Sequence, residues 1–323
     1  MAKFTMDSLK IYSQSDVNNL IIYRDGETKL GEKVQVTASL DSLKSSDAEF
    51  VLLGIPEDIG IRANSGIAGA STTWRPALMA FLNIQSNRFL SGEEILVLGH
   101  FEIEEPEDST VNALRKKVSE IDNLVHPVIE KIVAEGKIPI VIGGGHNNAY
   151  PIIRGTSLAK KNPIDVLNID AHADLRESEG RHSGNGFTYA LSEKYLDNYF
   201  MYGLHQNYNN EAILTQIETS PKLKAIFFDD ILKGTGYEDF FSAIGSTAGL
   251  EIDLDCIQNV LASAETPSGF SVNDIRKLIL TNKNKFSYLH ISEGATRLLD
   301  GRVSKLTSKL IAYLVSDFVK AQV

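Results

Sequence analysis

Eight short apolar runs recur along the chain from residue 49 onward, and they constrain the fold more than any other feature of the sequence. Each run is continuous rather than alternating with polar residues, which is typical of strands covered on both faces. We therefore expect a mainly parallel sheet with helices on both faces. The runs are EFVLLGI at 49–55, ILVLGHF at 95–101, IPIVIGG at 138–144, DVLNIDA at 165–171, NYFMYGLH at 198–205, KAIFFDD at 224–230, GLEIDLD at 249–255 and FSYLHIS at 286–292.

Segments with helical spacing lie between these runs. Over residues 111–132 apolar side chains recur every three or four positions, and Pro127 is expected to kink or split that helix. Similar spacing over 301–322 predicts a helix that closes the chain. Because strand and helix alternate without a Pro-, Gly- or Ser-rich linker, residues 48–323 are expected to form one α/β domain. Residues 1–47 are polar and are expected to form an N-terminal extension.

The charge and composition of the chain indicate which kinds of binding partner to expect. The chain has 42 Asp and Glu against 32 Lys and Arg, a net charge of −10, so we expect no nucleic-acid partner. Its apolar runs fall short of the roughly 20 residues that span a bilayer, so we expect no membrane partner. Cys256 is the single cysteine, and the first residues lack the apolar stretch of a signal peptide. These features favour a cytoplasmic protein that acts on a small molecule.

Residues of the kinds that bind metal ions lie at the ends of four of the apolar runs: His146, Asp170 to Asp174, Asp253 with Asp255, and Glu293. Side chains two apart on a strand point the same way, so Asp253 and Asp255 share one face, as do Asp170 and His172. Buried carboxylates repel one another and need cations, protons or arginines nearby, and two divalent ions would balance four carboxylates. Oxygen and imidazole donors without thiolate suit Mn²⁺, with Zn²⁺, Fe²⁺, Co²⁺ or Ni²⁺ as competitors. The candidate ligands are His146, Asp170, His172, Asp174, Asp253 and Asp255.

Each motif also has a plainer interpretation. An Asp-x-Asp pair such as Asp253 and Asp255 often lies at a solvent-exposed strand edge or caps the backbone at the end of an element. The glycines at 143–145 could form a phosphate-binding turn, but no Gly-Lys-Ser/Thr and no G-x-G-x-x-G follows them. The coincidence of ligand residues at successive strand ends favours the metal site. Periodicity leaves open whether the βα units close into a barrel or form an open, doubly wound sheet.

Three of these motifs resemble, in order and separation, the metal motifs of the ureohydrolases, the family of the arginases, agmatinases and formimidoylglutamases. They are GGGHN at 143–147, DAHAD at 170–174 and EIDLD at 251–255. The resemblance extends over about residues 50–320 and implies an open, doubly wound sheet of eight parallel strands. It implies two Mn²⁺ ions per chain, one held by His146, Asp170, Asp174 and Asp253 and the other by Asp170, His172, Asp253 and Asp255, with Asp170 and Asp253 bridging.

The sequence departs from the family pattern at several positions. Gly145 replaces the usual acid before the histidine, Glu251 stands where serine is usual, and Gln258-Asn259 replaces Asp-Pro. Arginases carry a histidine, a proton shuttle, two residues after Ser-Gly-Asn, whereas the run 183–187 here is Ser-Gly-Asn-Gly-Phe. This run follows Asp-Leu-Arg at 174–176. Both segments, and the early loop Arg-Ala-Asn-Ser-Gly at 62–66, are similar to the corresponding segments of the formimidoylglutamases.

The resemblance implies hydrolysis of a C–N bond in an amidine by water activated between two metal ions. Formimidoylglutamate is the favoured substrate, giving glutamate and formamide. The alternatives are arginase, agmatinase or guanidino-acid hydrolase activity and, in another class, a non-catalytic metal-binding relative. The family also implies a homo-oligomer, a trimer or hexamer.

Roles for single residues follow from the same resemblance. His182 stands just before the serine and is a substitute proton shuttle, although a surface-loop histidine is the plainer interpretation. For Glu293 and Arg176 the plainer interpretations are a capping glutamate and an exposed loop arginine. The implied catalytic residues are Asp174, Glu293 and His182, and the implied substrate contacts are Arg176, Ser183, Asn185 and Glu293.

Overall fold

A nine-stranded sheet runs through the computed structural model of this chain, which describes residues 8–234 and 239–323. The strand order is β1-β3-β2-β4-β9-β8-β5-β6-β7, and all neighbouring pairs are parallel except β1 and β3. The sheet is therefore open and doubly wound, as the family resemblance implied, and is not a barrel. The strands are β1 Leu9–Ile11, β2 Phe50–Gly54, β3 Ile95–Phe101, β4 Ile138–Ile142, β5 Ile164–Ile169, β6 Leu196–Leu204, β7 Leu223–Phe227, β8 Gly249–Asp253 and β9 Leu289–Ser292.

The sheet has one strand more than the eight expected, and this strand comes from the N-terminal region. Strand β1 pairs antiparallel with β3, with Leu9 opposite Phe101. Val17 and Leu30, farther along the same region, are fully buried in the core. Residues 8–47 therefore pack onto the sheet, and the division of the chain at residue 47 stays a prediction.

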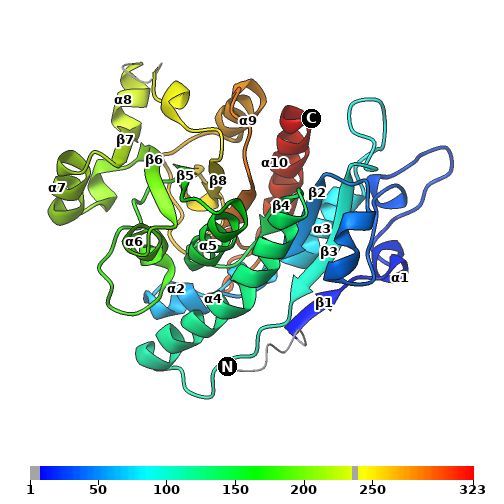
Figure 1. Ribbon diagram of the computed structural model, residues 1–323, viewed down its shortest axis with the longest axis horizontal. Coiled ribbons are helices and arrows are strands. Elements are labelled where there is room, and N and C mark those ends of the chain that lie inside the picture. Colours follow the sequence, from blue (N-terminus) through cyan, green and yellow to red (C-terminus); the bar gives the residue numbers. More distant parts are fainter. Residues whose placement is uncertain (1–7, 235–238) are drawn as a thin grey trace.

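Helices cover both faces of the sheet (Figure 1). Apolar side chains of α3, α9 and α10 fill the core on one face, and those of α2, α4, α5, α6 and α7 fill the core on the other. This two-sided cover explains why the strands are continuous apolar runs. The helices are α1 Gln14–Asn18, α2 Ile59–Ala63, α3 Trp74–Leu82, α4 Val111–Ala134, α5 Ala149–Lys160, α6 Gly186–Ser192, α7 Glu211–Thr219, α8 Phe228–Lys233, α9 Val272–Thr281 and α10 Thr307–Gln322.

One of the two alternatives for Pro127 and the start of the last helix need correction. Helix α4 is not split, because it continues through Pro127. Buried Val125 and Val128 flank the proline in the same core, so packing outweighs the lost backbone hydrogen bond. The last helix begins at Thr307 rather than at 301. Before it, Val303 forms an isolated bridge with Arg297, so the backbone at this residue is not helical.

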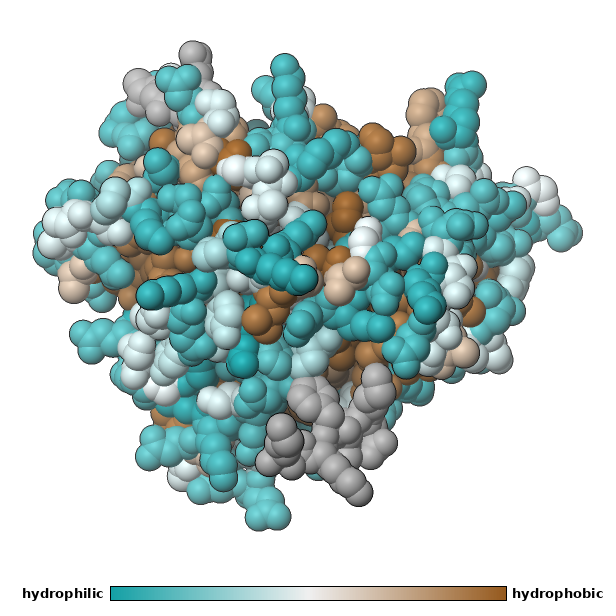
Figure 2. All heavy atoms as spheres, viewed as in Figure 1, coloured by the Kyte–Doolittle hydropathy of each residue, from teal (hydrophilic) through white to brown (hydrophobic). Residues whose placement is uncertain are grey.

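Figure 2 shows mostly hydrophilic side chains on the face of the molecule that it displays, with small hydrophobic patches between them. Among the described residues, no helix is long and apolar enough to cross a bilayer.

The strand order brings the four polar strand ends together. Strands β4, β9, β8 and β5 are consecutive in the sheet although β5 follows β4 in the chain. The segments with candidate ligands follow the carboxyl ends of these four strands. Because parallel strands end at the same edge of a sheet, the order places the candidate ligands side by side.

Candidate metal centre

Four of the predicted ligands meet beyond the ends of β4, β5 and β8. The Nδ1 atom of His146 lies 3.2 Å from Asp170 Oδ2 and 3.0 Å from Asp174 Oδ2. The same nitrogen is 3.1 Å from Asp253 Oδ2. One imidazole nitrogen carries at most one hydrogen and cannot donate fully to three carboxylates. An octahedral ion with bonds of about 2.1 Å holds neighbouring ligand atoms about 3 Å apart, so these spacings suit a divalent cation.

A second group of ligands adjoins the first and shares Asp170 with it. The Nδ1 atom of His172 lies 3.3 Å from Asp255 Oδ2 and 3.6 Å from Asp170 Oδ1. One ligand atom from each of these three residues lies within 4.8 Å of the other two. The structure thus gathers all six predicted ligands into two adjoining groups. A bridging role for Asp253 stays a prediction, because the contacts place it in the first group.

The centre holds closely spaced carboxylates together with the imidazoles of His146 and His172. Burial and the neighbouring carboxylate of Asp170 raise the pKa of Asp174 to about 6. Burial and the neighbouring Asp253 raise the pKa of Asp255 well above its ordinary value. On the side of the carboxylates, Nδ1 of His146 and Oδ1 of Asp255 are buried without a well-aligned hydrogen bond. Buried polar atoms without partners are costly, and divalent cations would partner these, so the residues present fit such ions.

Glu57, which the sequence analysis missed, holds the glycine turn that carries His146. Its buried Oε1 accepts hydrogen bonds from the backbone N–H of Gly145 at 3.1 Å and from the amides of Asn147 at 3.1 Å and Asn148 at 2.6 Å. Glu57 lies three residues after the end of β2. The same rule that singled out polar residues after apolar runs would therefore have found it.

Two acids at the centre have a backbone conformation that residues other than glycine rarely adopt. Asp174 has φ +49° and Glu293 has φ +61°. Such strained positions cluster at functional sites. Buried Glu293 accepts a hydrogen bond from the backbone N–H of His146 at 2.8 Å, and burial with the nearby Asp253 raises its pKa. Glu293 therefore lies beside His146, and its contact with a substrate stays a prediction.

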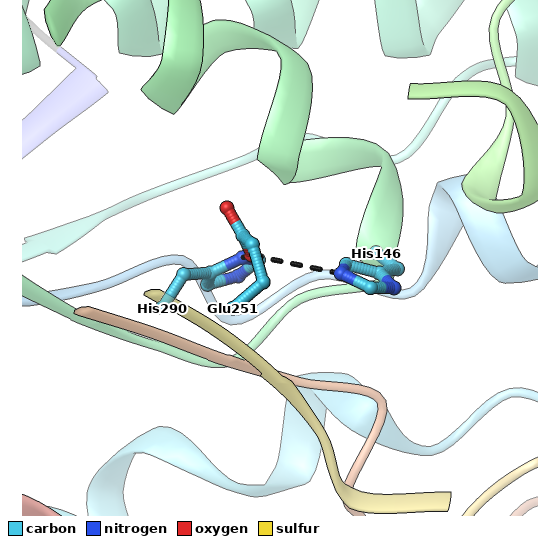
Figure 3. Close-up of side chains that lie close together, drawn as sticks. All are labelled: His146, Glu251 and His290. Atoms are coloured by element: carbon cyan, nitrogen blue, oxygen red, sulfur yellow. Dashed lines mark hydrogen bonds and ion pairs between the residues drawn. The ribbon is translucent and has the colours of Figure 1, made fainter. Parts of the chain in front are cut away.

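A carboxylate and a second histidine, Glu251 and His290, lie on one side of His146 (Figure 3). Oε2 of Glu251 lies 2.5 Å from Nδ1 of His290 and 3.5 Å from Nε2 of His146. The hydroxyl of Tyr288 donates to Oε1 of Glu251 at 2.7 Å. Burial alone would raise the pKa of Glu251, but the two histidines lower it to about 2. The sequence analysis treated Glu251 only as a departure and missed His290, which lies inside an apolar run.

Arg176 and Ser183, two of the predicted substrate contacts, lie in the segment between β5 and α6, and each contacts Asn64. The guanidinium of Arg176 donates to Asn64 Oδ1 at 2.9 Å and to Glu179 Oε1 at 2.6 Å. The amide of Asn64 lies 3.4 Å from the hydroxyl of Ser183. We call Asn64, Arg176, Glu179 and Ser183 the rim. Because the Arg176 side chain is 49% exposed, the rim is open to a ligand.

His182 and Asn185 are buried and engaged within the loop. Nδ1 of His182 accepts from the backbone N–H of Gly184 at 3.1 Å, and Nε2 lies 3.2 Å from Glu179 Oε1. Burial and the nearby arginines lower its pKa to about 4. The amide of Asn185 donates to the carbonyls of Glu177 and Gly180. These contacts use both ring nitrogens of His182 and hold the loop, so its proton transfer and the Asn185 substrate contact stay predictions.

Arg181, which the sequence analysis also missed, ties this loop to the rest of the site. Its guanidinium donates to Asp122 Oδ2 on α4, to Asn185 Oδ1 and to the carbonyl of Asn147, each at 2.8 Å. Both charged side chains of the Arg181–Asp122 pair are buried. The pair therefore joins the segment that carries His146 to the loop that carries the rim.

Comparisons with known proteins agree with this arrangement. A model of the arginase family matches residues 48–318. The formimidoylglutamase of Macrococcus caseolyticus is 29% identical over 273 residues, which cover 82% of this chain and 83% of that protein. The formimidoylglutamase of Streptococcus pyogenes serotype M3 is 28% identical over 223 residues, which cover 64% of each chain.

A solved structure of Trypanosoma cruzi formiminoglutamase with Mn²⁺ has a similar fold. Its TM-score is 0.71 at 20% identity, and the match covers 91% of this chain and 98% of that chain. At this identity the likeness concerns the fold.

Proposed function

This chain belongs to the arginase family, and we propose that it hydrolyses the C–N bond of formimidoylglutamate to glutamate and formamide. The convergence of three carboxylates on Nδ1 of His146, with the His172 group beside it, carries the proposal. The names of its relatives in Macrococcus caseolyticus and Streptococcus pyogenes support this choice of substrate.

Two divalent ions, Mn²⁺ in the first instance, are the proposed cofactors. The Trypanosoma cruzi structure with Mn²⁺ supports this metal, and other divalent transition metals are the alternatives. When bound, such ions lower the pKa of water and supply a nucleophile at neutral pH. The proposed ligands are His146, Asp170, Asp174 and Asp253 for one ion, and Asp170, His172, Asp253 and Asp255 for the other.

The other roles belong to side chains of this protein. Asp174 accepts a proton from the attacking water and passes it toward the leaving nitrogen, since its carboxylate faces the centre. Glu293 lies beside the ligands, where its carboxylate orients the cationic amidine. At the rim, Arg176 pairs with the substrate carboxylate and Ser183 adds a hydroxyl contact. Asp174 and Glu293 adopt strained backbone conformations, which the surrounding structure must fix before the substrate arrives.

Three further properties are proposed with this function. Arginine, agmatine and other guanidino compounds are the alternative substrates. A trimer or hexamer in the cytoplasm is the proposed state of the protein. A metal-binding relative without activity is the alternative from another class.

Metal content and an assay panel test the proposal. We expect two Mn²⁺ per chain by elemental analysis, and a lower melting temperature after chelation because four buried carboxylates then repel one another. We expect formamide from formimidoylglutamate and little urea from arginine or agmatine. If chelation changed neither metal content nor melting, the metal centre would be disproved. Bound metal without turnover of any substrate in the panel would favour the non-catalytic relative.

A further inference from the structure

We propose that Glu251 and His290 are positioning residues for metal binding. This buried pair holds the proton of the His146 ring on Nε2, which leaves Nδ1 free to bind an ion. The inference rests on the metal centre of the proposed function but not on the identity of the substrate. It concerns a feature of this chain, because the usual family motif has serine where Glu251 stands.

The two nitrogens of His146 face different surroundings. Nδ1 is within 3.2 Å of the carboxylates of Asp170, Asp174 and Asp253. Nε2 faces Oε2 of Glu251 at 3.5 Å (Figure 3). A carboxylate on this side favours the proton on Nε2, and a histidine that binds a metal needs its other nitrogen protonated.

The His146 ring is held from its edge as well. The ring of Phe187 lies 5.2 Å from it, centroid to centroid, with the two planes at 87°. The imidazole therefore has little freedom to turn Nδ1 away from the carboxylates.

His290 and Tyr288 hold the carboxylate of Glu251 in place. Glu251 is fully buried, and a buried carboxylate without partners is costly. Its Oε2 contacts Nδ1 of His290 at 2.5 Å, and its Oε1 accepts from the hydroxyl of Tyr288 at 2.7 Å. Nε2 of His290 lies 3.3 Å from the carbonyl of Gly143, in the turn that carries His146. The pair thus connects β8, β9 and this turn behind one proposed ligand.

The substitution Glu251→Gln tests this role with little change of shape. A glutamine has one acceptor oxygen, whereas Glu251 accepts from Tyr288 on one side and faces two histidines on the other. If the amide oxygen stays with Tyr288, its NH₂ group faces Nε2 of His146 and favours the proton on Nδ1. The proton then blocks the nitrogen that the ion needs.

Titration with Mn²⁺, followed by calorimetry or by the electron paramagnetic resonance of free Mn²⁺, measures the effect. In Glu251→Gln we expect one of two binding steps to weaken 10- to 100-fold and the other to stay within about twofold. The variant His290→Asn should weaken the same step. Since the two residues act as a unit, the double variant should lose about as much as Glu251→Gln alone.

Two further variants separate positioning from a loss of structure. Asp165→Asn alters another buried carboxylate, which accepts from the backbone N–H of Gly245 and from Asn198 at the other end of β5. It should lower the melting temperature and leave both binding steps unchanged. Tyr288→Phe in the Glu251→Gln background frees the amide oxygen to face the histidines and should restore part of the lost affinity.

Two results would overturn the inference. One is unchanged Mn²⁺ binding steps in both Glu251→Gln and His290→Asn, and the other is an equal loss of Mn²⁺ affinity in Asp165→Asn. Two wild-type binding steps without hydrolysis of formimidoylglutamate would overturn the proposed substrate and leave the role of Glu251 measurable.

Discussion

Arg176→Ala tests the proposed substrate class most directly. In the structure the Arg176 guanidinium already donates to Asn64 and Glu179 and is half exposed. A charge-assisted hydrogen bond contributes about 1.5–3 kcal/mol to binding. Arg176 is exposed and must exchange its contact with Glu179 for one with the substrate, so its contribution should lie at the lower end of this range. About 1.4 kcal/mol corresponds to a tenfold change in affinity. We therefore expect KM for formimidoylglutamate to rise about tenfold, and kcat to change less because the reacting carbon lies elsewhere.

The assay compares kcat/KM for formimidoylglutamate and agmatine in the wild type and in Arg176→Ala. Agmatine has no carboxylate, so its kcat/KM should stay within about twofold. The matched control is Glu179→Gln, which removes the carboxylate that competes for Arg176. It should lower KM for formimidoylglutamate by a factor of about two to five, the range of a surface ion pair. Equal losses on both substrates in Arg176→Ala would show that this arginine supports the loop and does not bind the substrate.

Three further predictions concern the ligands, the buried ion pair and acid stability. Asp255→Asn should reduce bound metal from two ions toward one and lower turnover by orders of magnitude while melting stays cooperative; full activity would contradict the ligand role. Arg181→Met leaves buried Asp122 unpaired and should lower the free energy of unfolding in urea by about 3–5 kcal/mol, with partial recovery on adding Asp122→Asn; an unchanged midpoint would refute this. Burial lowers the pKa of His126 from 6.5 to about 4. As the pH falls from about 6.5 to 4, the imidazole therefore takes up a proton in the unfolded chain before it does so in the folded chain, and the free energy of unfolding decreases. In urea titrations, His126→Gln should flatten that part of the profile, and an unchanged slope would refute the assignment.

The sequence predicted the strands and the candidate ligands because both depend on local pattern. Each of the eight apolar runs overlaps a strand, and Asp170, His172, Asp253 and Asp255 follow from alternation at strand ends. Strand β1 was missed because it is three residues long and forms only through pairing with β3. No period of two can be recognised over so short a segment.

The partners that hold the ligands could not be predicted in the same way. Glu57 reaches Gly145 across 88 positions of sequence, and Glu251 reaches His290 across 39. Such contacts depend on which strands become neighbours, and here β9 lies between β4 and β8. Local pattern identifies a polar residue at a strand end, but the strand order decides what it contacts.

The departures from the family motif bear on the alternative of a non-catalytic relative. Gly145 replaces the usual acid, yet a carboxylate still contacts this turn, because Glu57 accepts a hydrogen bond from the backbone N–H of Gly145. Glu251 replaces serine, and the added negative charge is met by His290 and Tyr288. These two changes are thus compensated by a buried partner from another strand end or strand. A site that was losing its function would not need such buried polar partners, because apolar residues in their place would cost less free energy to bury. The compensated departures therefore favour a metal centre that is still in use.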